Sequence, residues 1–301
     1  MPPHAAIRTE GLTKDFGGGH GVFALDLEVE RGEIFGFLGP NGAGKSTTMR
    51  MLLDLIRPTS GSATVLGLDT HRDSLELRHR VGFLPGDFEL YPKLTGREVL
   101  DFFAALNGGV DRRVLDDLVE RFDAQLDRPV HDLSTGNRQK LGIVQAFMHE
   151  PECLILDEPI AGIDPLVQHS FHALLEEVAA EGRTVFLSSH TLSEVERVAK
   201  RIAILRRGRL VVVDTVADLL QVARQRYDIE FGATAPAADA LRSVEGVEEV
   251  DGDGPRLVVS FTGAPDPLIK AIAAYDVRSL RSHDADLEEV FLRYYRDEGA
   301  A

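Results

Sequence analysis

A glycine-rich stretch with one lysine and two hydroxyls is the clearest chemical feature of this sequence. Residues 39–47 read GPNGAGKST, which fits the phosphate-binding pattern G-x-x-x-x-G-K-[ST] at Gly39, Gly44, Lys45 and Ser46. Glycines let backbone N–H groups curl around phosphate oxygens, and the start of a following helix favours an anion. We expect Lys45 to reach the β- and γ-phosphates of a nucleotide and Ser46 to bind Mg²⁺. A strand-like segment at 33–38 before the loop, and apolar residues spaced as in a helix over 46–56 after it, argue against a chance turn.

Two adjacent carboxylates follow another apolar run. The segment LILDEP places Asp157 and Glu158 at the end of a predicted buried strand, and therefore at one edge of a parallel sheet. We expect Asp157 to hold Mg²⁺, directly or through water, and Glu158 to orient and polarise an attacking water. Together with the phosphate-binding loop, this pair still fits kinases, GTPases and many ATPases.

A second anion-binding element distinguishes among these classes. LSTGNRQK (133–140) lies on a loop that opens a predicted helix from Asn137 to Met148, so Ser134 and Gly136 stand at a helix N-terminus. One γ-phosphate needs only one such cradle, and the loop around Lys45 already supplies it. The second cradle therefore suggests another copy of the protein facing the first.

At this point the chain resembles the ATP-binding family of the ABC transporters. LSTGN stands where that family has its Leu-Ser-Gly-Gly-Gln signature. Asp164, in Gly-Ile-Asp, resembles the residue of the D-loop, and His190, in LSSH, resembles the switch histidine. Phe16 occupies the place of the aromatic residue that stacks on adenine. These motifs occur in the family's order over residues 16–190.

The resemblance implies ATP and Mg²⁺ as cofactors and assigns roles residue by residue. The expected catalytic residues are Glu158, His190 and Lys45. The expected metal ligands are Ser46 and Asp157. The residues expected to bind ATP are Phe16, Gly39, Asn41, Gly42, Gly44, Lys45, Ser46, Thr47, Ser134, Gly136 and Asp164.

Two positions depart from the family pattern. The family has a Mg²⁺-binding glutamine after its second apolar strand, but this chain has Gly86 and then Asp87 there. Glycine has no side chain with which to ligate a metal, so we hypothesise that Asp87 or a water fills the gap. Thr135 replaces the first glycine of the signature, and Asn137 replaces its glutamine. A β-branched residue at 135 requires an ordinary negative φ.

The resemblance also implies partners. Two cassettes would face head to tail around ATP, most simply as a homodimer, and would drive a separate membrane permease from the cytoplasmic face of the cell membrane. Three segments resemble the drug and multidrug exporters within the family: GFLPGDFELYPKLTGREVLDFF, RQKLGIVQAFMHEPECLILDEP and LEEVFLRYY. Phe88, Leu90 and Tyr91 form an apolar cluster that either packs inside the helical segment or contacts a cytoplasmic helix of the permease. The sequence does not name the cargo.

Composition limits the partners and the kinds of site that this chain can have. The chain has 301 residues and a formal net charge of −16, so it repels nucleic-acid phosphates and we expect no nucleic-acid partner. A single cysteine, Cys153, excludes a disulfide framework and a cysteine zinc site, and we expect it to be a packed residue. The segment MPPHAAIRTEGL lacks the apolar core of a secretory signal, and no run of 18 apolar residues occurs.

The elements that must position these residues form an α/β pattern. Short apolar runs at 33–38, 153–156 and 184–189 alternate with helix-like segments, whereas 24–30 alternates as a half-buried strand. Together with the resemblance, this predicts a P-loop ABC cassette over residues 1–217. It has a mixed sheet core, an antiparallel β subdomain and a helical insert at about 87–148. Residues 218–301 read as a small α+β domain with the β-α-β-β-α-β order of the ferredoxin-like arrangement, closed by a last helix.

Other classes remain as alternatives. A soluble ABC ATPase of translation or repair would carry a second cassette, a long coiled coil or zinc modules, and none is visible in this sequence. A GTPase would carry Asn-Lys-x-Asp for guanine, and no asparagine here precedes a lysine. A third reading makes the C-terminal domain a ligand-sensing module attached to the transporter, which is compatible with the main one.

Overall fold

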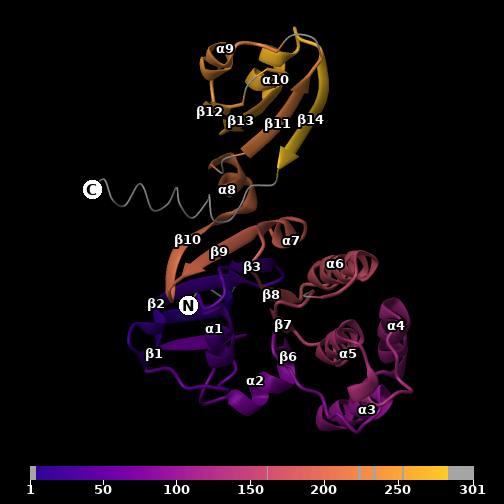
Figure 1. Cartoon of the computed structure of the whole chain (residues 1–301). Helices are drawn as coiled ribbons and strands as arrows, with labels where there is room; N and C mark the ends of the chain where they lie inside the picture. Colours follow the sequence, from indigo (N-terminus) through magenta and orange to yellow (C-terminus); the bar gives the residue numbers. More distant parts are fainter. Residues whose placement is uncertain (1–4, 161, 223–224, 233–234, 253, 284–301) are drawn as a thin grey trace. The chain divides into compact units, whose positions relative to one another are not determined.

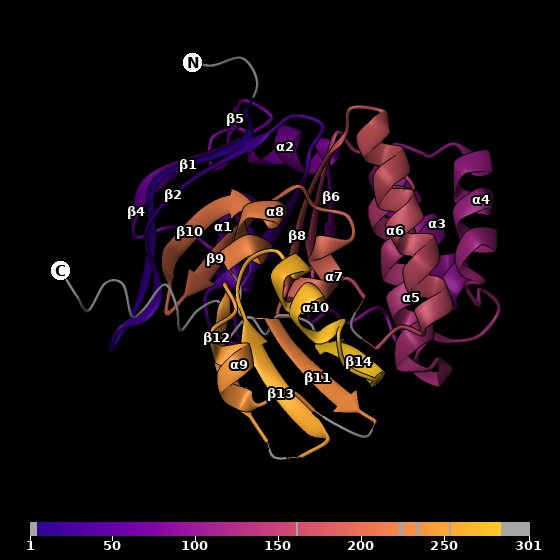
Figure 2. The same ribbon diagram turned by 90° about the horizontal axis from the view of Figure 1, so that it is seen from above.

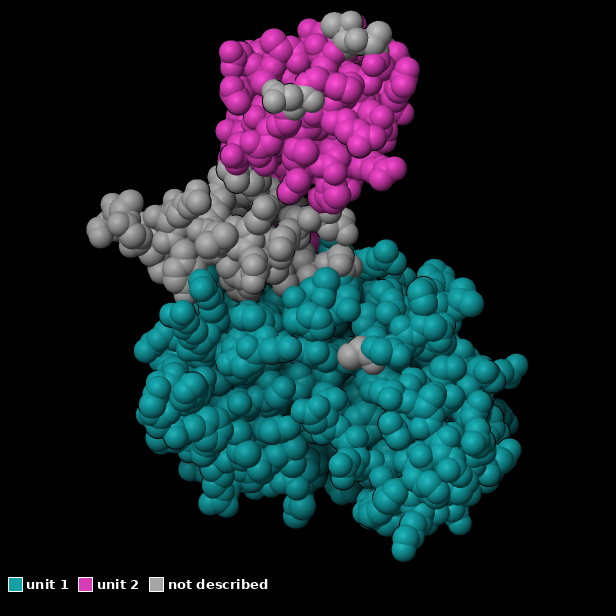
Figure 3. Space-filling view, in the orientation of Figure 1, with its two compact units in different colours: residues 1–213 teal, residues 214–301 magenta. Residues whose placement is uncertain are grey.

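The chain divides into two compact units, Met1–Val213 and Asp214–Ala301 (Figure 3). The structure is a computed structural model, and it describes residues 5–160, 162–222, 225–232, 235–252 and 254–283. Each unit is treated by itself below. Across the described residues, no helix is both long enough and apolar enough to cross a membrane.

A six-stranded sheet forms the centre of the first unit (Figure 1). Its strands, in spatial order, are β10 (Arg209–Thr215), β9 (Arg201–Arg206), β3 (Ile34–Leu38), β8 (Thr184–Ser189), β7 (Cys153–Asp157) and β6 (Val81–Leu84). The pairs β9–β3, β3–β8, β8–β7 and β7–β6 are parallel. Strands β3, β7 and β8 are buried at every position, which explains their uninterrupted apolar sequences.

Aromatic packing stabilises the middle of this sheet. The ring of Phe186 lies 6.0 Å from that of Phe35 and 5.1 Å from that of Phe37, between the centroids. All three side chains are fully buried. Because β3 and β8 are neighbours, these contacts fix the strand that leads into the glycine-rich loop against the strand that ends at His190.

The first unit also contains a four-stranded antiparallel sheet. Its order is β2 (His20–Glu30), β1 (Ala5–Gly17), β4 (Ser60–Val65) and β5 (Leu68–Asp69). The apolar side of β2 lies in the same hydrophobic core as β3, α1 and β7, as the alternation in its sequence predicts. The buried Thr9 hydroxyl donates to the Leu25 carbonyl at 2.8 Å and accepts from the Leu27 N–H at 2.9 Å, which joins β1 to β2.

Helices flank the central sheet. Helix α1 (Lys45–Leu52) follows the glycine-rich loop, and α2 (Ser74–Arg80) precedes β6. Three helices lie between β6 and β7 in the sequence: α3 (Gly96–Leu106), α4 (Arg112–Phe122) and α5 (Thr135–Phe147). The short 3₁₀ helix η1 (Val130–Asp132) lies between α4 and α5. Helices α6 (Pro165–Ala180) and α7 (Leu192–Glu196) precede and follow β8 in the sequence. Helices α3 to α6 lie next to one another in both views (Figure 1, Figure 2).

Local signals explain where these helices begin and end. Thr95 and Glu98 form a complete capping box at the start of α3, and the Asp111 carboxylate caps α4. Helix α1 is shorter than the apolar periodicity of 46–56 predicts. It ends at Leu52 because Asp54 adopts a left-handed φ of 52° and the N–H of Leu55 turns back to the Arg50 carbonyl at 2.9 Å.

Among its described residues, the second unit has the helix α8 (Val216–Val222), which follows β10, and a four-stranded antiparallel sheet with two further helices. Its other elements are β11 (Gln225–Phe231), α9 (Ala238–Arg242), β12 (Val247–Asp251), β13 (Arg256–Phe261), α10 (Asp266–Ile272) and β14 (Val277–His283). The strand order is β12-β13-β11-β14, and every pairing is antiparallel. The last helix predicted from the sequence, ADLEEVFLRYY, lies outside the described residues.

The architecture expected for the first unit is confirmed: a mixed central sheet, an antiparallel sheet and helices between β6 and β7. The same unit contains the only cysteine of the sequence, Cys153, at the start of β7 and fully buried. Burial raises the pKa of its thiol to about 12.

This burial predicts an inert thiol. In the native protein at pH 8, Cys153 will not react with a disulfide reagent, because the thiolate becomes populated only as the pH approaches the raised pKa. In urea the same thiol will react fully, as absorbance of the released chromophore reports. The variant Leu75→Cys provides an exposed control thiol, since residue 75 is 75% exposed. Stoichiometric modification of native Cys153 would contradict this packing.

Candidate functional site

The glycine-rich loop joins β3 to α1 and begins the candidate site. Gly44 has a φ of 112° and precedes the first turn of α1, a conformation that side chains rarely adopt. A Cβ on Gly39 would lie 2.3 Å from the Leu205 carbonyl oxygen, so only glycine fits beside β9. Together these glycines direct backbone N–H groups at the N-terminus of α1 toward one place, which is the geometry of an anion cradle.

The loop surrounds a cavity of about 610 Å³. Its lining residues from the sequence-based prediction are Phe16, Asn41, Gly42, Gly44, Lys45, Ser46, Thr47 and Glu158. Gly39, although it lies at the start of the loop, is not among the lining residues. The cavity also has three glycine or alanine positions, Gly19, Gly21 and Ala43, and two residues that the sequence did not identify, His20 and Arg207.

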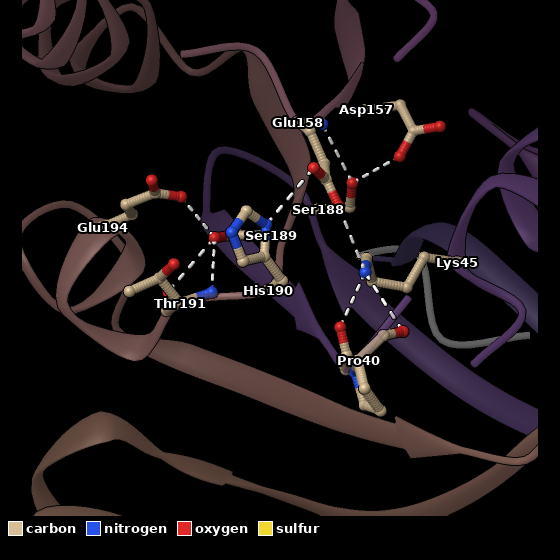
Figure 4. Close-up of polar contacts among 10 residues, drawn as sticks. Pro40, Lys45, Asp157, Glu158, Ser188, Ser189, His190, Thr191 and Glu194 are labelled. Carbon is tan, nitrogen blue, oxygen red and sulfur yellow. Dashed lines mark hydrogen bonds and ion pairs between the residues drawn. The ribbon is translucent and has the colours of Figure 1, made fainter. Parts of the chain in front are cut away.

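Lys45 is the buried cation of this cavity. Its side chain is 5% exposed, and its Nζ donates to the Gly39 carbonyl at 2.6 Å and to the Pro40 carbonyl at 3.5 Å (Figure 4). The same Nζ lies 3.3 Å from Oε1 of Glu158. The ammonium is thus satisfied by the loop's own carbonyls and by the carboxylate that follows β7, in the position from which it is expected to reach a phosphate.

Glu158 is held between two of the predicted catalytic side chains. Its Oε2 lies 3.2 Å from Nδ1 of His190, while its Oε1 contacts Lys45 (Figure 4). Its backbone has a left-handed φ of 48°, which costs about 1 kcal/mol for a residue other than glycine. The Glu158 N–H donates to the Ser188 hydroxyl at 3.0 Å, and this bond from β8 helps to hold the turn in place.

Asp157 lies at the buried end of β7. It is 4% exposed, and Oδ1 accepts a hydrogen bond from the Ser188 hydroxyl at 2.5 Å. The nearest atom to an ideal Cβ on Gly86 is Oδ2 of Asp157, at 3.3 Å. The residue that replaces the family's glutamine therefore lies directly beside the carboxylate expected to hold Mg²⁺.

These donors fit a magnesium ion. Carboxylate and hydroxyl oxygens are the ligands that Mg²⁺ prefers, and it keeps several positions for water and for substrate phosphates. Asp157 and Ser46 would hold the ion, which would neutralise charge on the phosphates. No cluster of three or more His, Cys, Asp or Glu side chains suited to a metal occurs among the described residues.

Asp87 does not join this group in the structure. Its side chain is exposed, it does not line the cavity, and no hydrogen bond or ion pair to a described residue is present. His190, by contrast, stands at the end of β8 with its side chain half exposed. The neighbouring Ser189 hydroxyl bonds to Glu194 and to the Thr191 carbonyl, which supports the backbone just after β8.

The second predicted cradle is formed at the start of α5. Ser134 is the N-cap, and its hydroxyl accepts from the Asn137 N–H at 3.2 Å. Thr135 is the first helical residue and is absent from the described residues with positive φ, as its β-branched side chain requires. Ser134 is exposed, so its hydroxyl and the N–H groups beside it are open to an anion from outside the chain.

Asp164 lies close to this cradle in the fold. It caps α6, where its carboxylate accepts from the N–H groups of Leu166 and Val167, both at 3.1 Å. The Gly162 carbonyl oxygen lies 3.5 Å from an ideal Cβ on Gly136, so the loop before α6 lies against the start of α5. None of Ser134, Gly136 and Asp164 is among the described residues that line the Lys45 cavity.

Two lining residues were missed because they reach the cavity through sheet pairing. His20 begins β2, and Arg207 lies in the turn between β9 and β10 with a φ of 46°. That turn is fixed to the glycine-rich loop, because the Gly208 N–H donates to the Ala43 carbonyl at 2.8 Å. Arg207 makes no ion pair with a described residue. An arginine after β9 reads as part of a solvated basic cluster, so only the pairing of distant segments identifies it.

Comparison with known proteins gives a consistent result. Residues 22–161 match the family model described as ABC transporter. Over 98% of both chains, the protein is 34% identical to the bacitracin transport ATP-binding protein BcrA of Enterococcus faecalis. It is 37% identical to the probable multidrug ABC transporter ATP-binding protein YbhF of Escherichia coli, over 72% of this chain and 38% of the relative.

Solved structures give the same family. The structure described as the ATP-binding subunit of an ABC transporter superposes with a TM-score of 0.66 and 30% identity, over 71% of this chain and 91% of that chain. The dimeric post-hydrolysis cassette MJ0796, bound to ADP and Pi, superposes with a TM-score of 0.64 at 21% identity, which supports the fold alone.

The position of Arg207 generates a prediction. Arg207→Gln will weaken ATP binding about 3- to 10-fold, because the cavity loses a cation with no other described partner. Equilibrium binding of a fluorescent ATP analogue measures the effect. Arg209→Gln is the matched control, since its guanidinium lies over the Phe23 ring at 5.4 Å and does not line the cavity. Equal affinities of the two variants would show that Arg207 does not contact the nucleotide.

Proposed function

The chain belongs to the ATP-binding family of the ABC transporters, and we propose that it is the ATP-hydrolysing subunit of an exporter that works as a pair of cassettes. The ATPase activity and the use of ATP with Mg²⁺ follow from the family. The roles of individual residues, the identity of the partners and the cargo are the substance of the proposal.

The observation that carries the proposal is the separation of two anion cradles in one chain. The loop around Lys45 lines a cavity of about 610 Å³, and the cradle at Ser134 opens to solvent elsewhere on the same unit. A nucleotide held by Lys45 needs a second copy to present its Ser134 and Gly136. The γ-phosphate would then join two chains, and its loss would separate them.

Chemistry at this site follows from the Glu158 contacts. Glu158 accepts the proton of an attacking water as general base, while His190 at 3.2 Å orients its carboxylate and senses the γ-phosphate. Lys45 leaves its contact with Glu158 when a phosphate arrives, which frees Oε1 for the water. Asp157 and Ser46 would hold Mg²⁺, which would neutralise charge on the phosphates. A water fills the place beside Gly86, because Asp87 lies outside the cavity.

The adenine end of the cavity is assigned to Phe16. This side chain is 58% exposed at the end of β1, with the Lys14 Nζ 5.5 Å from its ring centroid. An exposed aromatic ring beside a phosphate-binding loop offers a stacking surface for the base. Asn41, Gly42 and Thr47 complete the loop around the phosphates.

The general-base role predicts a separation of binding from turnover. Glu158→Gln will bind ATP but lower the rate of hydrolysis about 10²- to 10⁴-fold, because an amide cannot accept the proton. It will accumulate an ATP-dependent dimer, seen by analytical ultracentrifugation. Glu120→Gln on the exposed face of α4 is the control and will keep the wild-type rate. Normal turnover in Glu158→Gln would remove this residue from the role of base.

A permease is the proposed membrane partner, and it places the chain at the cytoplasmic face of the cell membrane. A hollow of about 460 Å³ lies between β6 and the start of the helical segment, with Phe88, Leu90, Phe103 and Leu106 in its lining. Leu106 is 57% exposed. Its apolar lining suits a cytoplasmic helix of the permease. Tyr91, which we grouped with Phe88 and Leu90, instead packs edge-on against Phe102 with centroids 5.4 Å apart.

The docking hollow predicts a selective loss of assembly. Leu106→Asp will reduce co-purification with the permease at least about fivefold, because a carboxylate would be buried by the docking helix. Leu75→Asp, at a more exposed leucine outside the hollow, is the matched control. ATP binding by the soluble variant checks that the fold is intact. Unchanged co-purification would exclude this hollow as the docking site.

A drug-like or other hydrophobic compound is the proposed cargo. Support comes from relatives named for bacitracin transport and for multidrug transport. The test measures accumulation of bacitracin and of hydrophobic dyes in cells that express the chain with its permease. An exporter will lower this accumulation relative to cells that express the Glu158→Gln variant with the same permease. We further propose that residues 218–301 form an accessory regulatory domain of ferredoxin-like type beside the cassette of residues 1–217, which the order β11-α9-β12-β13-α10-β14 supports.

A further inference from the structure

One face of the sheet in the second unit is left open by its helices. Tyr227, Ile229 and Phe231 of β11 point to the side where α9 and α10 pack, and they share a core with Leu241 and Leu268. The alternate residues of each strand point to the other side. On that side Arg226 is 58% exposed, Arg256 is 78% exposed and His283 is 51% exposed.

The strand register places the charges of this open face in rows. Glu249, Ser260, Arg226 and His283 form one row across β12, β13, β11 and β14. Asp251, Val258, Asp228 and Arg281 form the next. Arg256, Glu230 and Ser279 form the third. The β12 edge of the face is therefore acidic, and the β14 edge is basic.

Part of this charge is paired within the chain. His283 Nε2 lies 2.8 Å from Asp228 Oδ2, and Arg256 lies 3.5 Å from Glu230. Asp251 and Arg281 are different, because they stand on opposite edges of the sheet, about 14 Å apart at a strand spacing of about 4.8 Å. Neither makes an ion pair with a described residue. Each edge thus presents a charge that forms no ion pair with the part of the chain that the structure describes.

We propose that this face pairs with the same face of a second copy, through a two-fold axis that runs along the strands. Such an axis lays β12 of one copy over β14 of the other. Asp251 then faces Arg281 of the partner subunit, and Glu230 faces Arg256 of the partner subunit in the neighbouring row. A two-fold axis across the strands would instead lay β12 on β12, acid against acid. The charge pattern selects one of the two arrangements.

The balance of charge argues for a second copy over a ligand of one sign. The face carries the cations Arg226, Arg256 and Arg281 with His283, and the anions Asp228, Glu230, Glu249 and Asp251. An anionic or cationic ligand would meet repulsion at one edge, whereas a face with both signs at opposite edges complements itself. Exposed ion pairs are individually weak, so the pairing needs tethering. The pairing of the two sheet faces therefore rests on the proposed function, because two cassettes joined by ATP raise the effective concentration of one second unit near the other.

Cysteine cross-linking tests the contact directly. In the full chain carrying Glu158→Gln, the double variant Asp251→Cys with Arg281→Cys will form an intermolecular disulfide at least about 10-fold faster with ATP than either single variant. An equimolar mixture of the two single variants will cross-link as well. Cys153 is fully buried and adds no background. A disulfide confined within one chain, or none, would overturn the pairing.

Charge reversal provides a second test in the same background. Asp251→Arg places arginine against Arg281 of the partner subunit, and Arg281→Asp places aspartate against Asp251 of the partner subunit. Each variant alone will weaken the ATP-dependent dimer about 5- to 10-fold in sedimentation experiments. Mixed in equal amounts they will restore it to within about twofold, because both contacts of the mixed dimer are again of opposite sign. Asp239→Arg on α9 makes the same charge change away from this face and will have no effect.

The outcomes separate this inference from the proposed function. Loss of dimer in both single reversals without recovery on mixing would overturn the pairing and would point to another occupant of the face, such as a small molecule in the hollow of about 270 Å³ beside Arg256. An ATP-dependent dimer that ignores both reversals would overturn this inference alone. Absence of any ATP-dependent dimer would count against the paired cassettes. The sheet pairing is then tested without nucleotide at high protein concentration, where an intermolecular disulfide in the double-cysteine variant would support it and no disulfide would overturn it.

Discussion

The fold of the first unit depends on holding one buried ammonium at the edge of a parallel sheet. Lys45 is 5% exposed, and its Nζ is satisfied by the Gly39 carbonyl at 2.6 Å and by Glu158 at 3.3 Å. A buried cation with a missing partner is strongly destabilising, so the loop and the end of β7 must meet in register. The Phe35–Phe186 and Phe37–Phe186 contacts supply that register, because they hold β3 beside β8, which in turn pairs with β7. The ammonium is also what gives the cavity its preference for a phosphate.

The same edge explains why the site is incomplete in one chain. Parallel strands bring their carboxyl ends together, and Asp157, Glu158 and His190 follow or end two of these strands. Glu158 lines the cavity with Lys45 and also contacts His190. The cradle at Ser134 begins a helix between β6 and β7 and opens to solvent. A nucleotide that is attractive to both cradles converts its binding energy into closure of two chains. The second unit has an acidic and a basic edge on one open face, which carries our proposal of a further contact between the same two chains.

Much of this was predictable from the sequence because the informative residues are adjacent in the chain. GPNGAGKST, LILDEP and LSTGN each carry their chemistry within a few positions, and the buried strands read as continuous apolar runs. His20 and Arg207 were not predictable, since they join the cavity only through the pairing of β1 with β2 and the fixing of the β9–β10 turn to Ala43. The end of α1 was missed because a left-handed turn at Asp54 overrides an apolar period that continues to residue 56. The sequence could not decide whether Asp87 replaces the glutamine, because its position next to Gly86 in the chain does not show that its side chain is exposed and does not line the cavity.

The claim that two chains complete each site has one decisive measurement. Lys45→Ala removes the loop's cation, and Ser134→Arg blocks the second cradle, so either variant alone has two defective sites per dimer. In an equimolar mixture, half of the dimers are mixed, and each mixed dimer combines the intact Lys45 loop of one chain with the intact Ser134 cradle of the other at one of its two sites. ATPase activity will then recover to about a quarter of the wild-type rate if the sites act independently. No recovery on mixing, with both variants folded, or full activity of Ser134→Arg alone, would contradict a site shared between two chains.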